Sequence, residues 1–233
     1  IASSLGNMVR TARDIVADKA IFAFVIAYFF YIDGVNTVIH MATVYGSTLG
    51  LGTNGMILAL LVTQIVAVPF SILFSRLAGR FGSIFMIRLA IIVYFIICTV
   101  GFYMGFSLER VDPASPLYAA ALSRSTLLFW AMAALVGTCQ GGIQALSRSF
   151  FGKLIPPRRS NEFFGFFDIF GKFASVIGPL LYALVSGATG RSSFGALCLL
   201  LLFLAGFLIL LYAKKPLEEL EAERAAQNLP GEA

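Results

Sequence analysis

Apolar residues run in six long stretches along the chain, and polar and charged residues gather between them. A lipid core of about 30 Å needs roughly 20 apolar residues per helical span. Backbone amides inside lipid have no water to bond, so each stretch is predicted to be a helix. The sequence therefore predicts an all-α membrane protein with six transmembrane helices. The stretches are residues 20–45, 54–74, 84–106, 127–151, 163–186 and 193–213.

The segments outside the transmembrane domain, which we place at residues 20–213, are amphipathic or polar. In residues 1–19, apolar side chains recur at helical spacing, which predicts a cytoplasmic linker helix lying on the membrane face or serving only as a connection. Residues 214–233 are rich in glutamate and predict an exposed cytoplasmic tail helix. The apolar side chains of the first segment are Leu5, Met8, Val9, Ala12 and Val16.

Glycine and proline predict local features within the spans. Pro69 in the second span and the Gly-Pro pair at 178–179 in the fifth predict kinks, because proline removes an amide donor and clashes with the preceding turn. Gly137 and Gly141 in the fourth span have the four-residue spacing that permits close helix contact. The longest loop on the outer side is expected at residues 107–125, where two prolines occur.

Basic residues are unevenly distributed between the two sets of connections. The positive-inside rule places the side rich in lysine and arginine in the cytoplasm. Both termini are therefore predicted to be cytoplasmic, and we expect a bacterial inner membrane. The rich side carries Arg10, Arg13, Lys19, Arg76, Arg80, Arg88, Arg148, Lys153, Arg158, Arg159, Lys214, Lys215 and Arg224, and the poor side only Arg110, Arg124 and Arg191.

Composition excludes several classes of function. The chain is 59% hydrophobic and 12% charged, against roughly 45–50% and 25% in a typical soluble domain. The net charge of +5 does not indicate nucleic-acid binding, because the cations lie at the ends of spans and form no stripe with aromatic residues. The cysteines lie inside spans without metal-ligand spacing, and hydrolase motifs and phosphate-binding loops do not occur. We therefore expect no enzyme, metal or cofactor.

Four polar residues share one side of the first span. A charge at the centre of a span costs about 2.5–3.5 kcal/mol on insertion scales, so such residues usually face a partner or a water-filled cavity. The only histidine of the chain lies among them, and an imidazole exchanges a proton near neutral pH. We predict that this side lines a substrate or proton pathway. Its residues are Asp33, Asn36, Thr37 and His40, at helical positions i, i+3, i+4 and i+7.

Two further pairs of polar residues lie four positions apart in later spans. Asp168 and Lys172 in the fifth span can form an ion pair on one helix surface, and a structural pair and a functional role both stay open. Gln140 and Gln144 in the fourth span either bond to neighbouring helices or contact a substrate. We add all four residues to the candidate substrate or proton pathway.

The connection at residues 75–82 reads S-R-L-A-G-R-F-G. It resembles the G-x-L-a-D-r-x-G loop between paired helices of major facilitator superfamily transporters. Ser75 stands at the position of the first glycine and Gly79 at that of the acid, which weakens the charge contacts expected there. The candidate residues of this cytoplasmic loop are Arg76, Arg80 and Gly82.

A more specific resemblance comes from several other segments. They are similar to the vacuole-effluxer-like branch of the same superfamily, whose best-known members export amino acids from the fungal vacuole. The resemblance covers essentially the whole chain. The segments are D-G-V-N-T at 33–37, C-Q-G-G-I-Q-A-L-S-R-S-F at 139–150, I-P-P at 155–157 and E-F-F-G-F-F at 162–167.

The resemblance implies a specific architecture and mechanism. Transporters of this superfamily have twelve spans in two six-helix halves, each half made of two inverted three-helix repeats, and the halves rock about a central site. This chain then corresponds to the carboxyl-terminal half. The polar residues of its first and fifth spans would face the central cavity. Arg148, Arg158 and Arg159 would belong to the cytoplasmic gate.

The leading hypothesis is half of a secondary transporter for a small polar solute, with amino acids and proton coupling as options. The partners expected are the solute, the lipid bilayer and an amino-terminal six-helix half. A second copy of this chain, forming a homodimeric carrier, is the alternative partner. The chain begins with Ile1 rather than methionine, which favours a fragment. A membrane assembly protein without transport stays open, although it would not need the polar side of the first span.

Overall fold

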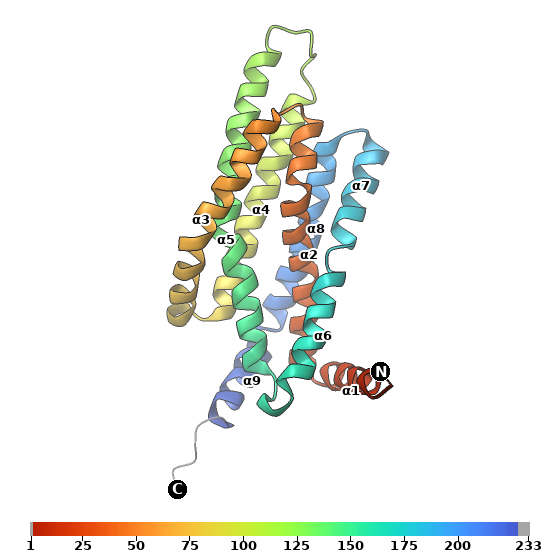
Figure 1. Ribbon diagram of the computed structural model, residues 1–233, viewed down its shortest axis with the longest axis vertical. Helices are drawn as coiled ribbons and strands as arrows, with labels where there is room; N and C mark the ends of the chain where they lie inside the picture. The colour runs from red at the N-terminus through yellow and green to blue at the C-terminus, as the bar shows by residue number, and fades with distance from the viewer. Residues whose placement is uncertain (1, 228–233) are drawn as a thin grey trace.

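The computed structural model describes the backbone of residues 2–227 and the side chains from residue 9 onward. Regular structure in this part of the chain is helical, and six helical segments are long and apolar enough to cross a membrane. Figure 1 shows them as an elongated bundle with both ends of the chain at one end. The helices that cross are α2 (Lys19–Thr48), α3 (Thr53–Phe81), α4 (Ser83–Leu108), α5 (Tyr118–Leu154), the pair α6 (Ser160–Phe173) and α7 (Ile177–Thr189), and α8 (Ser192–Tyr212).

Several helices extend beyond the apolar stretches that predicted them. The prediction that residues 75–82 form a connecting loop is wrong. Residues 75–81 are the last turns of α3, and only Gly82 connects α3 to α4. Gly82 has φ +88°, a conformation that glycine adopts without strain. The outer loop is shorter than expected for the same reason. It covers 109–117, because α4 ends at Leu108 and α5 begins at Tyr118.

The fifth span is interrupted at residues 174–176, between α6 and α7. The interruption comes directly before the Gly-Pro pair at 178–179, so the predicted distortion is confirmed there. The second proline behaves differently, since α3 runs unbroken past Pro69. The short helix η1 (Pro157–Arg159) joins α5 to α6.

Helix pairing follows a repeated pattern. Helices α4 and α8 pack on each other, while α2 packs on α8 and α5 packs on α4. When the first three spans are matched in order to the last three, α2·α8 and α5·α4 become equivalent pairs. This is the arrangement expected for two three-helix repeats. The side-by-side course of α3 and α5 is visible in Figure 1.

Glycines on α5 allow the close approach of α3, as their spacing predicted. A Cβ atom at Gly137 would lie 2.7 Å from the carbonyl oxygen of Thr63, and one at Gly142 would lie 2.5 Å from Cγ of Phe74. At Gly141 the nearest atom, Cβ of Ser71, would be 3.3 Å away. These contacts are too short for larger side chains, so glycine sets the separation of the two helices.

The helix α1 (Ala2–Ala17) lies crosswise at the end of the bundle that also carries α9 (Figure 1). Asp18 separates it from α2, because its carboxylate accepts hydrogen bonds from the first amides of α2. Ile15 packs against the bundle, whereas Val9 and Val16 are exposed on another side. This outward apolar side agrees with the predicted amphipathic helix, although the side chains of Leu5 and Met8 lie outside the described residues.

The tail helix α9 (Lys214–Gln227) is largely exposed, as predicted, and contacts the bundle along one side. Leu217 is fully buried, and Nζ of Lys153 lies 2.8 Å from Oε1 of Glu221. Apolar burial and this contact together fix α9 against α5. Residues 228–233 of the predicted tail lie outside the described residues.

Candidate functional site

A charged pair connects α5 and α6 within the depth of the bundle. The guanidinium of Arg148 donates to both carboxylate oxygens of Asp168, and Nη2 lies 3.4 Å from Oδ2. Arg148 precedes the end of α5 by six residues and Asp168 follows the start of α6 by eight. At ~1.5 Å per residue, the pair lies roughly 9–12 Å inside the helix ends.

An aromatic ring holds the arginine as well. The guanidinium carbon of Arg148 lies 5.0 Å from the ring centroid of Phe164, which is one helical turn before Asp168 on α6. Cation–π contact and the ion pair therefore orient the guanidinium from the same helix. Both charged side chains remain about half exposed, at 55% and 46%, so they stay accessible to a solute.

This pairing corrects one sequence prediction. Asp168 was expected to pair with Lys172 on its own helix, but its ion-pair partner is Arg148, and Lys172 is exposed. In the part of the chain that the structure describes, Lys172 makes no ion pair. The pairing also joins a residue assigned to the gate with one assigned to the pathway. Arg148 and Asp168 therefore belong to one site.

A polar pocket of about 210 Å³ lies beside the charged pair, between α2, α5 and α6. It brings together three sequence-predicted candidates from two helices: Asn36, Gln144 and Arg148. Two amide groups and a guanidinium supply donors and acceptors, and two aromatic rings and an isoleucine complete the lining. The full lining is Tyr28, Ile32, Asn36, Gln144, Arg148 and Phe167.

The four polar residues of α2 occupy different environments. Asp33 and Thr37 are fully buried, and the Thr37 hydroxyl donates to the backbone carbonyl of Asp33 at 2.7 Å. Asn36 is partly exposed and donates to Oγ of Ser175 at 2.9 Å. His40 is exposed. Of the four, only Asn36 lines the polar pocket, and the shared pathway role of the four stays a prediction.

The glutamines of α5 face different spaces. Gln144 lines the polar pocket, whereas Gln140 lines a second, mainly apolar pocket of about 90 Å³ together with Gln64 and Met132. Oε1 of Gln140 is buried without a hydrogen-bond partner in the described structure. Neither glutamine side chain bonds to a neighbouring helix there, so their alternative interpretation as interhelical bonding residues is not supported by the contacts.

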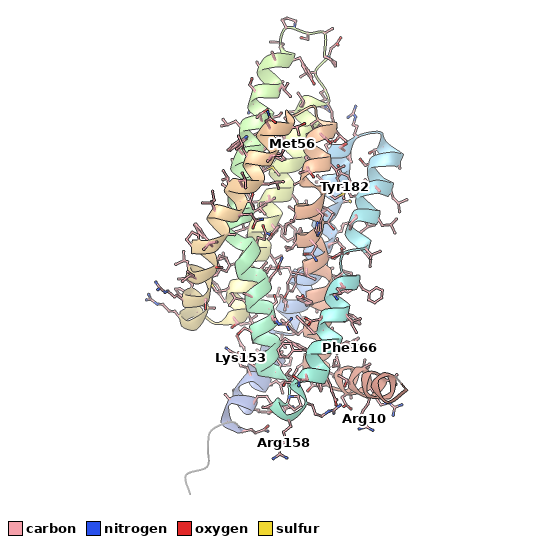
Figure 2. All side chains as sticks on the ribbon, in the orientation of Figure 1. Arg10, Met56, Lys153, Arg158, Phe166 and Tyr182 are labelled. Carbon is pink, nitrogen blue, oxygen red and sulfur yellow. The ribbon has the colours of Figure 1, made fainter. Side chains whose placement is uncertain are left out.

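The remaining gate candidates lie at the end of the bundle near the chain termini. Figure 2 shows Arg158 there, on the same end as Arg10 and Lys153. Arg159 links three elements, with Nη1 2.6 Å from Oδ2 of Asp14 on α1 and Nη2 2.9 Å from Oε2 of Glu162 on α6.

The other two arginines of the candidate gate are exposed on the last turns of α3. Arg76 makes no ion pair among the described residues, and Arg80 lies 5.4 Å from the ring centroid of Phe81. Neither touches the polar pocket between α2, α5 and α6. They therefore stay candidates for a surface role only.

Sequence analysis missed several residues that shape these sites. No sequence pattern distinguishes Tyr28 and Phe164 from the many other aromatic residues of their spans. The position of Phe164 one turn before Asp168 is the one signal that could have identified it. Asp14 was not among the candidate residues. Its contact with Arg159 joins positions 145 residues apart, and no local pattern signals such a contact.

Comparison with known proteins identifies the class. The family model described as "Vacuole effluxer Atg22 like" matches residues 1–221. The MFS-type transporter YxiO of Bacillus subtilis is 45% identical over 212 residues, covering 91% of this chain and 45% of that protein. Autophagy-related protein 22 of Coccidioides immitis is 28% identical over 201 residues, covering 85% of this chain and 32% of that protein. No solved structure matches the chain significantly.

The six helices that are long and apolar enough to cross a membrane define a multi-pass integral membrane protein, and the relative YxiO is an MFS-type transporter. The chain belongs to the vacuole effluxer Atg22-like family. It spans less than half the length of the curated relatives named above.

Proposed function

We propose that this chain forms one half of a secondary active transporter that moves a small polar solute by alternating access. The observation that carries the proposal is the Arg148–Asp168 pair, which lies inside the depth of the bundle and is half exposed beside a polar pocket. Charged groups at this depth avoid lipid and face water or protein. The face formed by α2, α5 and α6 is therefore assigned to an aqueous solute pathway.

A partner must cover this face from the other side. The proposed partner is a second six-helix unit, which the greater length of the relatives supports, since this chain covers 45% of YxiO. A second copy of this chain is the alternative. In both cases the solute would bind between two six-helix units near the middle of the membrane.

The chemistry of the pair favours a zwitterionic solute such as an amino acid. A carboxylate would bind Arg148, and an ammonium group would bind Asp168, so one solute can replace both halves of the ion pair. Asn36 and Gln144 add neutral donors and acceptors. Release of the solute re-forms the ion pair, which keeps the empty site free of unpaired charge. The pair thus acts as both binding site and cytoplasmic-side closure.

The proposal is tested by transport in proteoliposomes. The full-length parent protein should exchange radiolabelled amino acids across the vesicle membrane, whereas this chain alone should not when it is monomeric. An equal amount of labelled glucose serves as the uncharged control. Amino-acid transport by a demonstrably monomeric preparation of this chain would contradict the two-unit proposal, and glucose exchange without amino-acid exchange would contradict the solute class.

We also propose that both termini are cytoplasmic in a bacterial inner membrane. Cysteines placed at Ala114 in the exposed outer loop and at Asn161 near the start of α6 should then differ in intact cells. A membrane-impermeant maleimide should label the Ala114→Cys variant and leave Asn161→Cys unlabelled until the cells are opened. The native cysteines lie inside spans and give a low background. The opposite labelling pattern would reverse the orientation.

A further inference from the structure

Asp33 lies deep in the membrane and has no contact with solvent. It follows the start of the 30-residue helix α2 by fourteen residues, or roughly 21 Å at ~1.5 Å per residue, which places it near the middle of the span. Its exposed fraction is 0%. It therefore does not line the polar pocket, and the proposed solute site makes no use of it.

The carboxylate of Asp33 meets the interruption of the fifth span. Gly178, in the first turn of α7, donates its backbone N–H to Oδ2 of Asp33 at 2.8 Å. Three residues further along α2, Asn36 donates to Ser175 within the interruption. The space is fully used, because a Cβ atom at Gly178 would lie 2.0 Å from Oγ1 of Thr37. Helix α2 thus holds the start of α7 through two polar contacts.

The second oxygen of the carboxylate is left without a partner. Oδ1 of Asp33 is buried and accepts no hydrogen bond from any described residue. The hydroxyl of Thr37, one turn further along α2, is already donated to a backbone carbonyl. An unpaired buried carboxylate oxygen is costly when the group is charged, so the site is incomplete without a further positive species.

The surroundings offer no side chain that neutralises this charge. Helices α7 and α8 contain no aspartate, glutamate, lysine, arginine or histidine. Their titratable groups are Tyr182 on α7 and Cys198 and Tyr212 on α8, all neutral in their ordinary forms, and Tyr212 is exposed at the far end of α8. The charged residues of α6 are occupied or turned away: Glu162 bonds Arg159, Asp168 bonds Arg148, and Lys172 is exposed. On α2 itself, His40 is exposed and Tyr31 bonds Ser147 on α5.

We infer that Oδ1 of Asp33 is a proton-binding site whose occupancy is linked to the docking of α7 on α2. A proton forms an O–H bond at the orphaned oxygen and makes the buried group neutral. A metal cation fits poorly, because it needs several oxygen ligands and the N-terminus of α7 carries partial positive charge. The described residues also contain no cluster of three potential metal-binding side chains.

The linkage follows from burial. While α7 is docked, Oδ1 meets neither water nor a donor, so the protonated form is favoured. When α7 separates from α2 at residues 174–176, water reaches the carboxyl group and the proton leaves to solvent. Proton binding and docking therefore favour each other equally, as linkage requires. In a transporter, this step would couple proton binding to the rocking motion. Only this coupling rests on the proposed transport function, whereas the proton site itself does not.

Infrared difference spectroscopy of the purified chain tests the proton site directly. Exposed carboxyl groups are ionised at neutral pH, so a protonated-acid carbonyl band at pH 7 reports a buried acid. We expect such a band in the wild type, its loss in Asp33→Asn and its retention in the control Asp112→Asn, which alters an exposed loop acid. Asp33→Glu keeps a carboxyl group and should shift the band, which covers the case in which Asp33→Asn does not fold.

Hydrogen exchange of α7 tests the linkage. Exchange rates are first corrected for the intrinsic pH dependence of amide exchange. In the wild type, the α7 amides should then exchange faster over the pH range in which the infrared band of the protonated acid disappears. Asp33→Asn should show no such increase. The proposal is overturned if no infrared band at pH 7 depends on Asp33. It is also overturned if added sodium chloride, and not a lower pH, slows the exchange of the α7 amides. Neither measurement depends on solute movement, so the proton site can be confirmed or rejected independently of the transport proposal.

Discussion

Replacing Arg148 with glutamine is expected to reduce amino-acid transport by the full-length protein by about 10- to 100-fold. Charge-assisted hydrogen bonds contribute about 1.5–3 kcal/mol each, and the proposed solute carboxylate would lose that contact. Folding should change little, because a half-exposed ion pair contributes at most about 1 kcal/mol to stability. Initial transport rates, divided by the amount of folded protein, measure the effect.

Arg10→Gln is the matched control, because Arg10 is exposed on the first helix (Figure 2), is not a gate candidate and does not line the polar pocket. It removes the same charge and should leave the transport rate near that of the wild type. Asp168→Asn should also impair transport, mainly for solutes with an ammonium group. If Arg148→Gln transports normally, or if both arginine variants lose activity equally, Arg148 does not bind the solute.

Enlarging Gly137 is expected to destabilise the bundle by about 1–3 kcal/mol, the usual cost of overpacking a filled interface. The Cβ of Gly137→Ala would lie 2.7 Å from a backbone carbonyl oxygen of α3, and a backbone atom moves less readily than the end of a flexible side chain. Gly137→Leu should exceed this range and prevent α3 from packing along α5. Thermal unfolding in detergent, followed by the loss of the monodisperse peak, gives the order of stability.

Two other glycines calibrate this prediction. At Gly141 the nearest atom would be 3.3 Å from a new Cβ, so Gly141→Ala should cost less than Gly137→Ala. At Gly79, near the end of α3, a Cβ atom would meet nothing within 4 Å, and alanine favours a helix by up to about 1 kcal/mol over glycine. Gly79→Ala should therefore be neutral or stabilising. Equal effects at all three positions would mean that helix propensity, not contact, governs this interface.

The proposed solute site and the proposed proton site have different physical tasks. Arg148 and Asp168 are accessible and paired, so they can exchange their mutual contact for contact with a solute. Asp33 is inaccessible and half satisfied, so it can respond only to a species as small as a proton while α7 is docked. Asp168 lies on α6 and Asp33 contacts α7, so the interruption of the fifth span separates the two helices that these sites involve. A movement of α7 relative to α6 could therefore affect both sites.

The sequence by itself determined the elements and their class. Six runs of apolar residues required six membrane helices, because lipid offers no hydrogen bonds to the backbone. The Gly-Pro pair at 178–179 indicated the distortion of the fifth span, and the spacing of Gly137 and Gly141 indicated a close helix contact. These features depend on neighbours along the chain, which a linear pattern records. The motifs at 139–150 and 162–167 were also sufficient to indicate the family.

Only the tertiary structure decided which side chains meet. Helical periodicity placed Asp168 beside Lys172, yet the packing of α5 on α6 gave it Arg148 as partner. The same periodicity placed Asp33 with Asn36 on one side of α2, but α7 covers the first and the polar pocket borders the second. A helix pattern states which residues share a side. Which neighbour covers each part of that side depends on helices distant in sequence, whose positions follow from packing in three dimensions.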